Sequence, residues 1–256
     1  MNEAINITNS EFDLLLKLAR KMYFSKDVIK AFYEQATKEQ LEALTKVIHM
    51  EVEIREVHKR SRLLRKASFP CIKSFEGFDF SNIAFPDGYT AQDLQSLDFI
   101  EKAQDFVFHG PTGRGKTHLA IAIGIACINN AKRVRFFTVA QLGMALKQAK
   151  QNNTLEKFMK EFSKLDLLIL DELGYVPLDI EGARLLFQVM SGCYEKCSMV
   201  ITTNIEFGKW GTVFGDDKLA AAIIDRIVHH GRLVEFNGAS YRMSSALMLG
   251  NRAAVK

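Results

Sequence analysis

Residues 110–117 read Gly-Pro-Thr-Gly-Arg-Gly-Lys-Thr, which matches the phosphate-binding loop pattern G-x-x-x-x-G-K-[ST]. The glycines let backbone N–H groups turn inward around a triphosphate, Lys116 can reach the β- and γ-phosphates, and the Thr117 hydroxyl can ligate Mg²⁺. A short apolar strand at 106–108 precedes the loop and an Ala-rich apolar helix follows it, with its N-terminal partial positive charge aimed at the phosphates. The predicted cofactor-binding residues are Gly110, Pro111, Thr112, Gly113, Arg114, Gly115, Lys116, Thr117 and His118.

Composition places the chain among ordinary globular proteins. Its 256 residues, 48% hydrophobic and 25% charged, allow one large domain or one domain with a smaller companion. No apolar run is long enough for a bilayer and no basic segment precedes an apolar stretch at the N-terminus, so we expect a cytoplasmic protein. The four cysteines fit a reducing compartment. Cys193 and Cys197 could share a helix face, but no second Cys or His pair lies near them, which favours ordinary thiols over a metal site.

The net charge of +4 is unevenly distributed. Residues 1–66 hold 13 Lys and Arg against 10 Asp and Glu, and the basic residues crowd at the end of this segment. Such a cluster can follow a phosphate backbone, and it can equally be a solvated helix face. The candidate DNA-binding residues are Arg55, Lys59, Arg60, Arg62, Arg65 and Lys66.

The chain divides into three segments by pattern. Residues 1–66 show helical spacing of apolar residues and contain no glycine or proline, which predicts a small all-helical N-terminal domain. Residues 67–104 combine turn residues with phenylalanines, so this connector should pack on the core, and it could also help to hold a nucleotide base. Residues 105–256 alternate strand and helix, which predicts an α/β fold with a parallel sheet covered by helices on both faces. We expect strands at 106–108, 134–138, 166–171, 198–203 and 233–236, and helices at 116–130, 140–150, 155–163, 181–195 and 216–230.

Two carboxylates end the buried strand at 166–171. Asp171 is expected to join Thr117 in holding Mg²⁺, and Glu172 to polarise the attacking water for hydrolysis. The strand at 198–203 also ends in polar residues. If it lies beside the Asp171 strand, Asn204 should point at the γ-phosphate and report whether this phosphate is present.

The helix at 216–230 carries Arg226 away from its apolar face. An exposed arginine is usually a plain surface charge, but it can also reach the phosphate of a neighbouring subunit as an arginine finger. His229 and His230 follow on the same helix. Adjacent helix residues point in different directions, so we interpret this pair as structural and not as a metal site.

Across nearly its whole length, the chain resembles the IstB-like family, the ATP-binding helper proteins of insertion-sequence transposition, which are AAA+ ATPases related to the DnaC helicase loader. The matching segments are 110–120, 168–178, 202–215 and 220–231, together with Ser240-Tyr241-Arg242. The turn at Gly174-Tyr175 and the segment at Trp210-Gly211 are more specific than the phosphate loop itself.

The resemblance implies a role for each matched position. Lys116 and Thr117 bind ATP and Mg²⁺, Asp171 and Glu172 form the Walker B pair, and Asn204 is the first sensor. Arg226 is the intersubunit finger and Arg242 the second sensor. Members of the family assemble as ATP-dependent homo-oligomers on duplex DNA, select the target site and activate the partner transposase, an IstA-like protein. Their N-terminal helices contribute to assembly and DNA contact.

Three positions depart from the family pattern, and other functions share the same core. Thr112 replaces a proline, Arg114 replaces a small residue, and Ala239 stands where an acidic residue often precedes Ser-Tyr-Arg. Arg114 either adds a charge beside the phosphates or projects outward, as the variable position favours.

The two alternatives to a transposition ATPase are a DnaC-like loader of a replicative helicase and a nucleotide-gated DNA-binding scaffold with negligible turnover.

Overall fold

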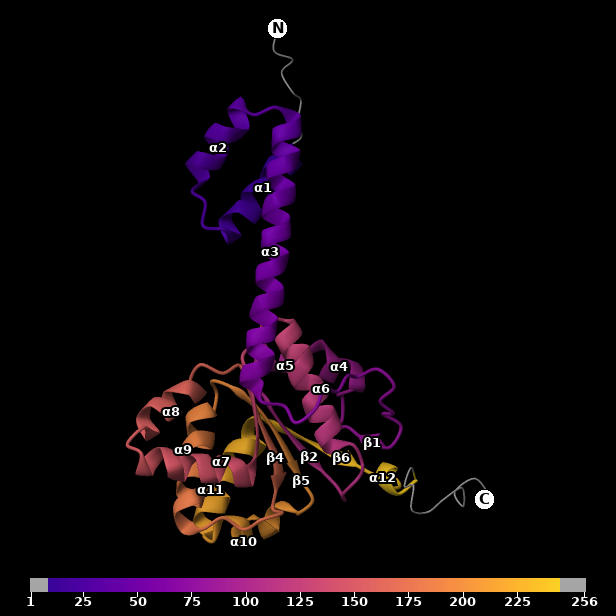
Figure 1. Cartoon of the computed structure of the whole chain (residues 1–256). Helices are drawn as coiled ribbons and strands as arrows, with labels where there is room; N and C mark the ends of the chain where they lie inside the picture. Colours follow the sequence, from indigo (N-terminus) through magenta and orange to yellow (C-terminus); the bar gives the residue numbers. More distant parts are fainter. Residues whose placement is uncertain (1–8, 245–256) are drawn as a thin grey trace. The chain divides into compact units, whose positions relative to one another are not determined.

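A computed structural model describes residues 9–244 and divides into two compact units, Met1–Arg62 and Leu63–Lys256 (Figure 1). Three helices make up the first unit: α1 (Asn9–Lys21), α2 (Lys26–Gln35) and α3 (Lys38–Ala67), whose last residues belong to the second unit. Leu15 and Leu18 of α1, Ile29 of α2 and Ile48 of α3 form its small apolar core. The long helix α3 begins with a capping box, in which Thr37 Oγ1 accepts from Gln40 N at 3.3 Å and Gln40 Oε1 accepts from Thr37 N at 2.8 Å.

The second unit is built on one six-stranded sheet in the order β1-β6-β2-β5-β4-β3. The five strands expected from the sequence are all present and pair in parallel. A sixth strand, β1, was not predicted; it has two residues and pairs antiparallel with β6 at the sheet edge. The strands are β1 (Ile83–Ala84), β2 (Asp105–His109), β3 (Val134–Thr138), β4 (Leu167–Leu173), β5 (Ser198–Thr203) and β6 (Gly231–Phe236).

Helices cover both faces of this sheet, as the alternation of elements predicts. The larger ones are α6 (Lys116–Asn129), α7 (Val139–Gln151), α8 (Leu155–Phe162), α9 (Ile180–Cys193) and α11 (Asp217–His230). Shorter helices that were not predicted are α4 (Ala91–Ser96), α5 (Asp98–Glu101), the 3₁₀ turn η1 (Phe207–Lys209), α10 (Trp210–Phe214) and α12 (Tyr241–Ser244). Within residues 9–244, no helix is both long enough and apolar enough to cross a membrane.

The two apolar layers follow from the alternation of side chains along each strand. In β4, Leu167 and Ile169 face α6, whereas Leu168 and Leu170 face α7 and α9. The phenylalanines of the connector, among them Phe69, pack on the α6 side as expected. Because the sheet is buried on both faces, polar side chains gather where the parallel strands end, and the phosphate loop leaves β2 at this edge.

Candidate functional site

The loop at 110–117 lies between β2 and α6, where close contacts dictate its glycines. Gly110 has a φ of 144°, and a Cβ at this position would collide with the carbonyl oxygen of Phe236. Gly113, at a φ of 83°, would likewise collide with the hydroxyl of Ser240. Only glycine allows the loop to take this course against β6 and the segment after it.

Lys116 is buried at the base of the loop, with 6% of its surface exposed. Its ammonium donates hydrogen bonds to the carbonyl oxygens of Gly110, at 2.6 Å, and Pro111, at 2.8 Å. Burial lowers the pKa of Lys116 to about 8, and the nearby Arg114 and Arg242 add to this effect, while Asp171 opposes it. Burial therefore destabilises the charged form of Lys116 in the free protein. A phosphate bound beside it would stabilise that charge.

Thr117 and Asp171 meet, as the sequence predicts. The Thr117 hydroxyl donates to the Asp171 carboxylate at 2.9 Å to Oδ1 and 3.1 Å to Oδ2. Asp171 is buried, and desolvation raises its pKa although Thr202 and Thr117 donate to it. These hard oxygen donors fit Mg²⁺, which binds proteins through one or two carboxylates and a hydroxyl next to substrate phosphates.

Thr202 is a site residue that the sequence analysis missed. Its hydroxyl donates to Asp171 and accepts from the backbone N–H of Glu172 at 3.0 Å, so it joins β5 to both carboxylate positions of β4. The signal was present in the sequence, since Thr202 and Thr203 are the polar residues that end the apolar run of β5.

Glu172 is turned out of the sheet by an irregularity in the pairing of β4 with β5. The register shifts between Leu170 and Leu173, and Glu172 has a φ of 61°, a conformation that is uncommon outside glycine. As a result its side chain is exposed and lines the same pocket as the phosphate loop, whereas Asp171 points inward. Adjacent carboxylates therefore lie in different environments, one buried against Thr117 and one open to solvent.

Arg114 does not project outward; that prediction was wrong. The side chain is half-buried, lines the pocket, and donates from Nη1 to the carbonyl oxygen of Phe236 at 3.2 Å. The end of β6 provides this acceptor, 122 residues away in the sequence. Arg114 thus adds a positive charge beside the phosphate loop.

The connector forms one wall of the pocket, which encloses about 730 Å³, a volume typical of small-molecule sites. Phe78 contacts the ring of His118 with a centroid distance of 5.0 Å, and the His118 Nε2 lies 2.9 Å from the carbonyl oxygen of Ser74. Other connector residues in this wall are Cys71, Lys73, Asp79, Asn82 and Ile83. The connector therefore does more than pack on the core, because it lines the space beside the phosphate loop.

Two further segments close on the loop. The Thr112 hydroxyl lies 2.9 Å from the hydroxyl of Tyr175, in the turn that follows Glu172. After β6, the N–H of Tyr241 donates to the carbonyl oxygen of Gly113 at 3.0 Å, and Arg242 lines the pocket. Thr112 thus ties the loop to the turn that follows Glu172.

Asn204 and Arg226 lie outside this pocket. The strand β5 is next to β4, as expected, but among the described residues it contributes Thr202 to the pocket wall, while Asn204 is exposed and absent from it. Arg226 lies on α11, where its Nη1 donates to the carbonyl oxygen of Ala222 at 2.7 Å and its guanidinium stacks over Phe187 at 5.3 Å. Within one subunit, the structure does not bring Arg226 to its own phosphate loop.

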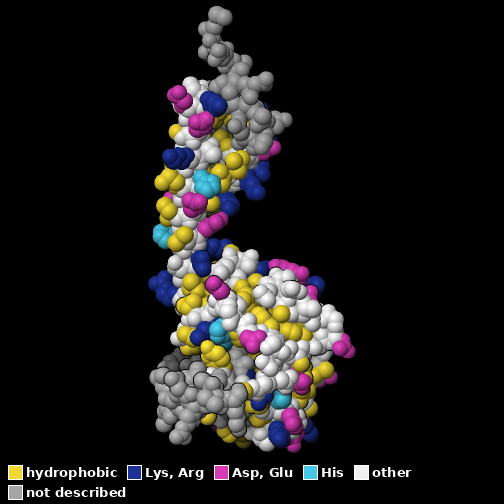
Figure 2. Space-filling view, turned by 90° about the vertical axis from the view of Figure 1, so that its right-hand side faces the viewer, with side chains coloured by type: hydrophobic (Ala, Val, Ile, Leu, Met, Phe, Trp, Pro, Cys, Tyr) yellow, Lys and Arg dark blue, Asp and Glu magenta, His cyan; other side chains and the backbone are white. Residues whose placement is uncertain are grey.

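The basic residues near the end of α3 are all exposed. Arg55, Lys59, Arg62 and Lys66 recur at intervals of three or four residues and therefore share one face of the helix. Arg55 is paired with Glu51 at 2.8 Å. Figure 2 shows Lys and Arg side chains along α3, mixed with hydrophobic and acidic ones.

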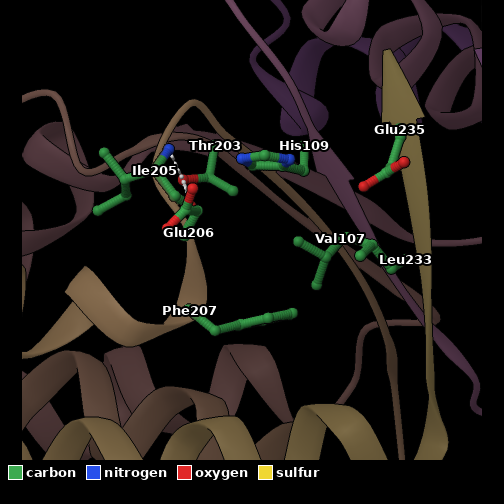
Figure 3. A pocket seen from close by; sticks show the side chains of 8 residues that line it. All are labelled: Val107, His109, Thr203, Ile205, Glu206, Phe207, Leu233 and Glu235. Carbon is green, nitrogen blue, oxygen red and sulfur yellow. Dashed lines mark hydrogen bonds between the residues drawn. The ribbon is translucent and has the colours of Figure 1, made fainter. Parts of the chain in front are cut away.

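A second, smaller pocket of about 140 Å³ lies at the ends of β2, β5 and β6 (Figure 3). Its floor is apolar, with Val107, Leu233 and Phe207, while His109, Glu206 and Glu235 surround it. Val107 belongs to the apolar layer opposite α6, so this pocket is on the other face of the sheet from the connector.

A mostly parallel sheet with this strand order, a phosphate loop after its central strand β2 and an acidic end of β4, two strands away, define an AAA+ P-loop NTPase. The chain belongs to the family of IstB-like ATP binding proteins, whose family model matches residues 18–248. It is 41% identical over 203 residues to the insertion sequence IS232 putative ATP-binding protein of Bacillus thuringiensis subsp. berliner. The matched region covers 79% of this chain and 81% of that protein. It is 36% identical over 243 residues to the insertion sequence IS21 putative ATP-binding protein of Pseudomonas aeruginosa, covering 94% and 91%.

Solved structures agree with the fold. The crystal structure of the DnaC helicase loader matches with a TM-score of 0.50 and 23% identity, over 57% of this chain and 85% of that one. The replication initiator DnaA bound to AMPPCP and single-stranded DNA matches with a TM-score of 0.50 and 20% identity, over 58% and 46%. At these identities the likeness concerns the fold alone.

Proposed function

We propose that this protein is an ATPase that oligomerises on duplex DNA and assists transposition by selecting the target site and activating a partner transposase. The observation that carries the proposal is a pocket lined by Lys116, Thr117 and Glu172, with the buried Asp171 hydrogen-bonded to Thr117. The two insertion-sequence relatives are named as putative ATP-binding proteins, which supports ATP as the nucleotide.

ATP binding would use the loop amides, Lys116 and the connector wall. Thr117 and Asp171 would hold Mg²⁺, which when bound neutralises charge on the phosphates. Glu172, exposed at the pocket, orients the attacking water and accepts its proton. Arg242 lines the same pocket and would contact phosphate as the second sensor. The place of Asn204 outside the pocket makes Thr202 the better-supported polar contact from β5.

Arg226 would complete the site of a neighbouring subunit. Its own phosphate loop is out of reach in the single chain, so a role in hydrolysis requires a second copy. ATP at one loop would then favour association with the next subunit. Hydrolysis would loosen this contact and release or remodel the assembly.

The helical segment 1–66 would contribute to assembly and DNA contact. On α3, the face that carries Lys59, Arg62 and Lys66 is exposed and can follow a phosphate backbone. Changing these three residues to glutamine should reduce the slope of log affinity against log salt by about 3, since each phosphate contact contributes about 0.9. The matched control changes Lys26, Lys30 and Lys38, which are exposed in the first unit away from the end of α3, and should leave the slope unchanged.

The decisive experiment compares the full chain with ATP, with ADP and without nucleotide. Phosphate release, retention of duplex DNA and particle size in negative-stain images are measured together. We expect ATP-dependent oligomers on DNA and phosphate release that Glu172→Gln strongly slows while the assembly persists. A monomer with equal DNA binding in all three conditions would refute the proposal, and assembly without phosphate release would favour the scaffold.

A helicase loader is the remaining alternative, because the core of the DnaC helicase loader has the same fold. Pull-down of the full chain with an integrase-type transposase and, separately, with a replicative helicase distinguishes the two functions. We expect capture of the transposase in the presence of ATP. Capture of the helicase alone would assign the loader function.

A further inference from the structure

Two histidines and a glutamate converge at the sheet edge opposite the phosphate loop. His229 and His230 end α11 just before β6 begins, and Glu195 lies in the turn between α9 and β5. Since β5 and β6 run parallel to β2, this is the amino edge of the sheet, whereas the phosphate loop is at the carboxyl edge. One ligand atom from each of the three residues lies within 4.8 Å of the other two.

The contacts within this cluster contradict the prediction that the adjacent histidines point apart. Their ring centroids are 4.2 Å apart, and Nε2 of His230 lies 3.0 Å from Oε1 of Glu195. The cause is the helix end, since both rings meet the α9–β5 turn that packs beside it. Glu195 has a φ of 57° in this turn, a backbone conformation that favours glycine.

A fourth residue supports the arrangement from outside. The hydroxyl of Tyr194 lies 2.8 Å from Nδ1 of His229. A hydrogen bond to one ring nitrogen fixes the orientation of an imidazole, and this is the usual outer contact of a metal-bound histidine. Glu195 and His229 are exposed and His230 is partly so, which leaves an ion an open path to the cluster.

We propose that Glu195, His229 and His230 form a binding site for a divalent transition-metal ion of the zinc class. Two imidazole nitrogens and a carboxylate oxygen match the ligand preference of Zn²⁺ and Co²⁺ and not that of Mg²⁺, which prefers oxygen. In a tetrahedral site with ligand bonds of about 2.0–2.2 Å, neighbouring donors are about 3.3–3.6 Å apart. In the structure the three ligand atoms lie within 4.8 Å of one another, and rotation of the side chains would bring them to this spacing. A water molecule would take the fourth position.

A metal here would join the end of α11 to the α9–β5 turn. Arg226 precedes His230 by one helical turn, so the ion would also hold the helix segment that carries this arginine. The site stands on its own contacts and does not depend on the proposed ATPase function.

The test is a titration of the full-length, chelator-treated protein with Co²⁺, in the presence of excess Mg²⁺ and without nucleotide. Mg²⁺ competes for the oxygen ligands of the phosphate-loop site but not for imidazoles. We expect one equivalent of Co²⁺ to give the visible ligand-field absorption of a nitrogen-liganded tetrahedral ion, and Zn²⁺ to displace it. His229→Ala and His230→Ala should each abolish the absorption, and Tyr194→Phe should weaken binding about 10-fold.

His58→Ala is the matched control, because His58 is an exposed histidine on α3, far from the cluster in sequence. Cys71→Ser removes the exposed thiol as a competing ligand. Zn²⁺ should raise the melting temperature of the control proteins but not that of the His229→Ala/His230→Ala double variant. The proposal is overturned if the protein binds no Co²⁺, or if the double variant binds it as tightly as the wild type.

Discussion

The pKa of Lys116 predicts that nucleotide affinity falls as the pH rises. Burial lowers this pKa to about 8 in the free protein, against an ordinary value of 10.5. Phosphate favours the charged ammonium, so the pKa must be higher in the complex than in the free protein. Nucleotide binding above pH 8 therefore takes up a proton. Because protons become scarcer as the pH rises, the affinity for nucleotide should decrease.

The magnitude follows from the fraction of free protein that is already protonated. With a free pKa of about 8, the dissociation constant of Mg-ATP should rise about 2-fold from pH 7 to pH 8 and about 10-fold from pH 7 to pH 9. Proton uptake should grow from about 0.1 to about 0.9 per nucleotide over the same range. Isothermal titration calorimetry in buffers with different ionisation enthalpies measures both quantities on one sample.

Two variants assign the effect to this residue. Lys116→Arg keeps a permanent positive charge, so any binding that remains should be independent of pH. Cys71→Ser, which removes the exposed thiol that lines the same pocket, should retain the full pH dependence. A dissociation constant that is constant from pH 7 to pH 9, or the same slope in Lys116→Arg, would refute the reasoning.

Three more predictions follow from the site. Glu172→Gln should slow phosphate release by about 10²- to 10⁴-fold with nucleotide affinity retained, and equal loss of binding would contradict its role. Gly113→Ala should weaken nucleotide binding, because its Cβ collides with a serine hydroxyl. Gly88→Ala, at a similar φ of 73° but with nothing within 4 Å, should cost only about 1–2 kcal/mol of unfolding free energy in denaturant melts. Arg226→Ala should retain ATP binding and lose about 10³-fold in hydrolysis. Hydrolysis should return when the Arg226→Ala protein is mixed with a variant that lacks Lys116, because each subunit supplies the group that the other lacks. Failure of this complementation would argue against a shared site.

Local pattern predicted much of the fold. The segments expected at 134–138 and 198–203 have the same bounds as β3 and β5, because apolar runs between turn residues specify buried strands directly. The two-residue strand β1 and the helix α12 were missed, since elements this short carry no period to detect. In the site, the meeting of Thr117 with Asp171 was predicted because parallel strand ends share one edge of the sheet.

By itself, the sequence determined that this chain has a phosphate loop on an α/β core with carboxylates at a strand end. Only the tertiary structure decided what those groups touch. Thr112 meets Tyr175 across 63 residues, and Arg114 meets Phe236 across 122. His229 and His230 converge on Glu195 instead of pointing apart. The reason is physical: motifs and periodicity encode local backbone geometry and burial, whereas these contacts depend on strand order and on the turns that bring distant segments to one edge.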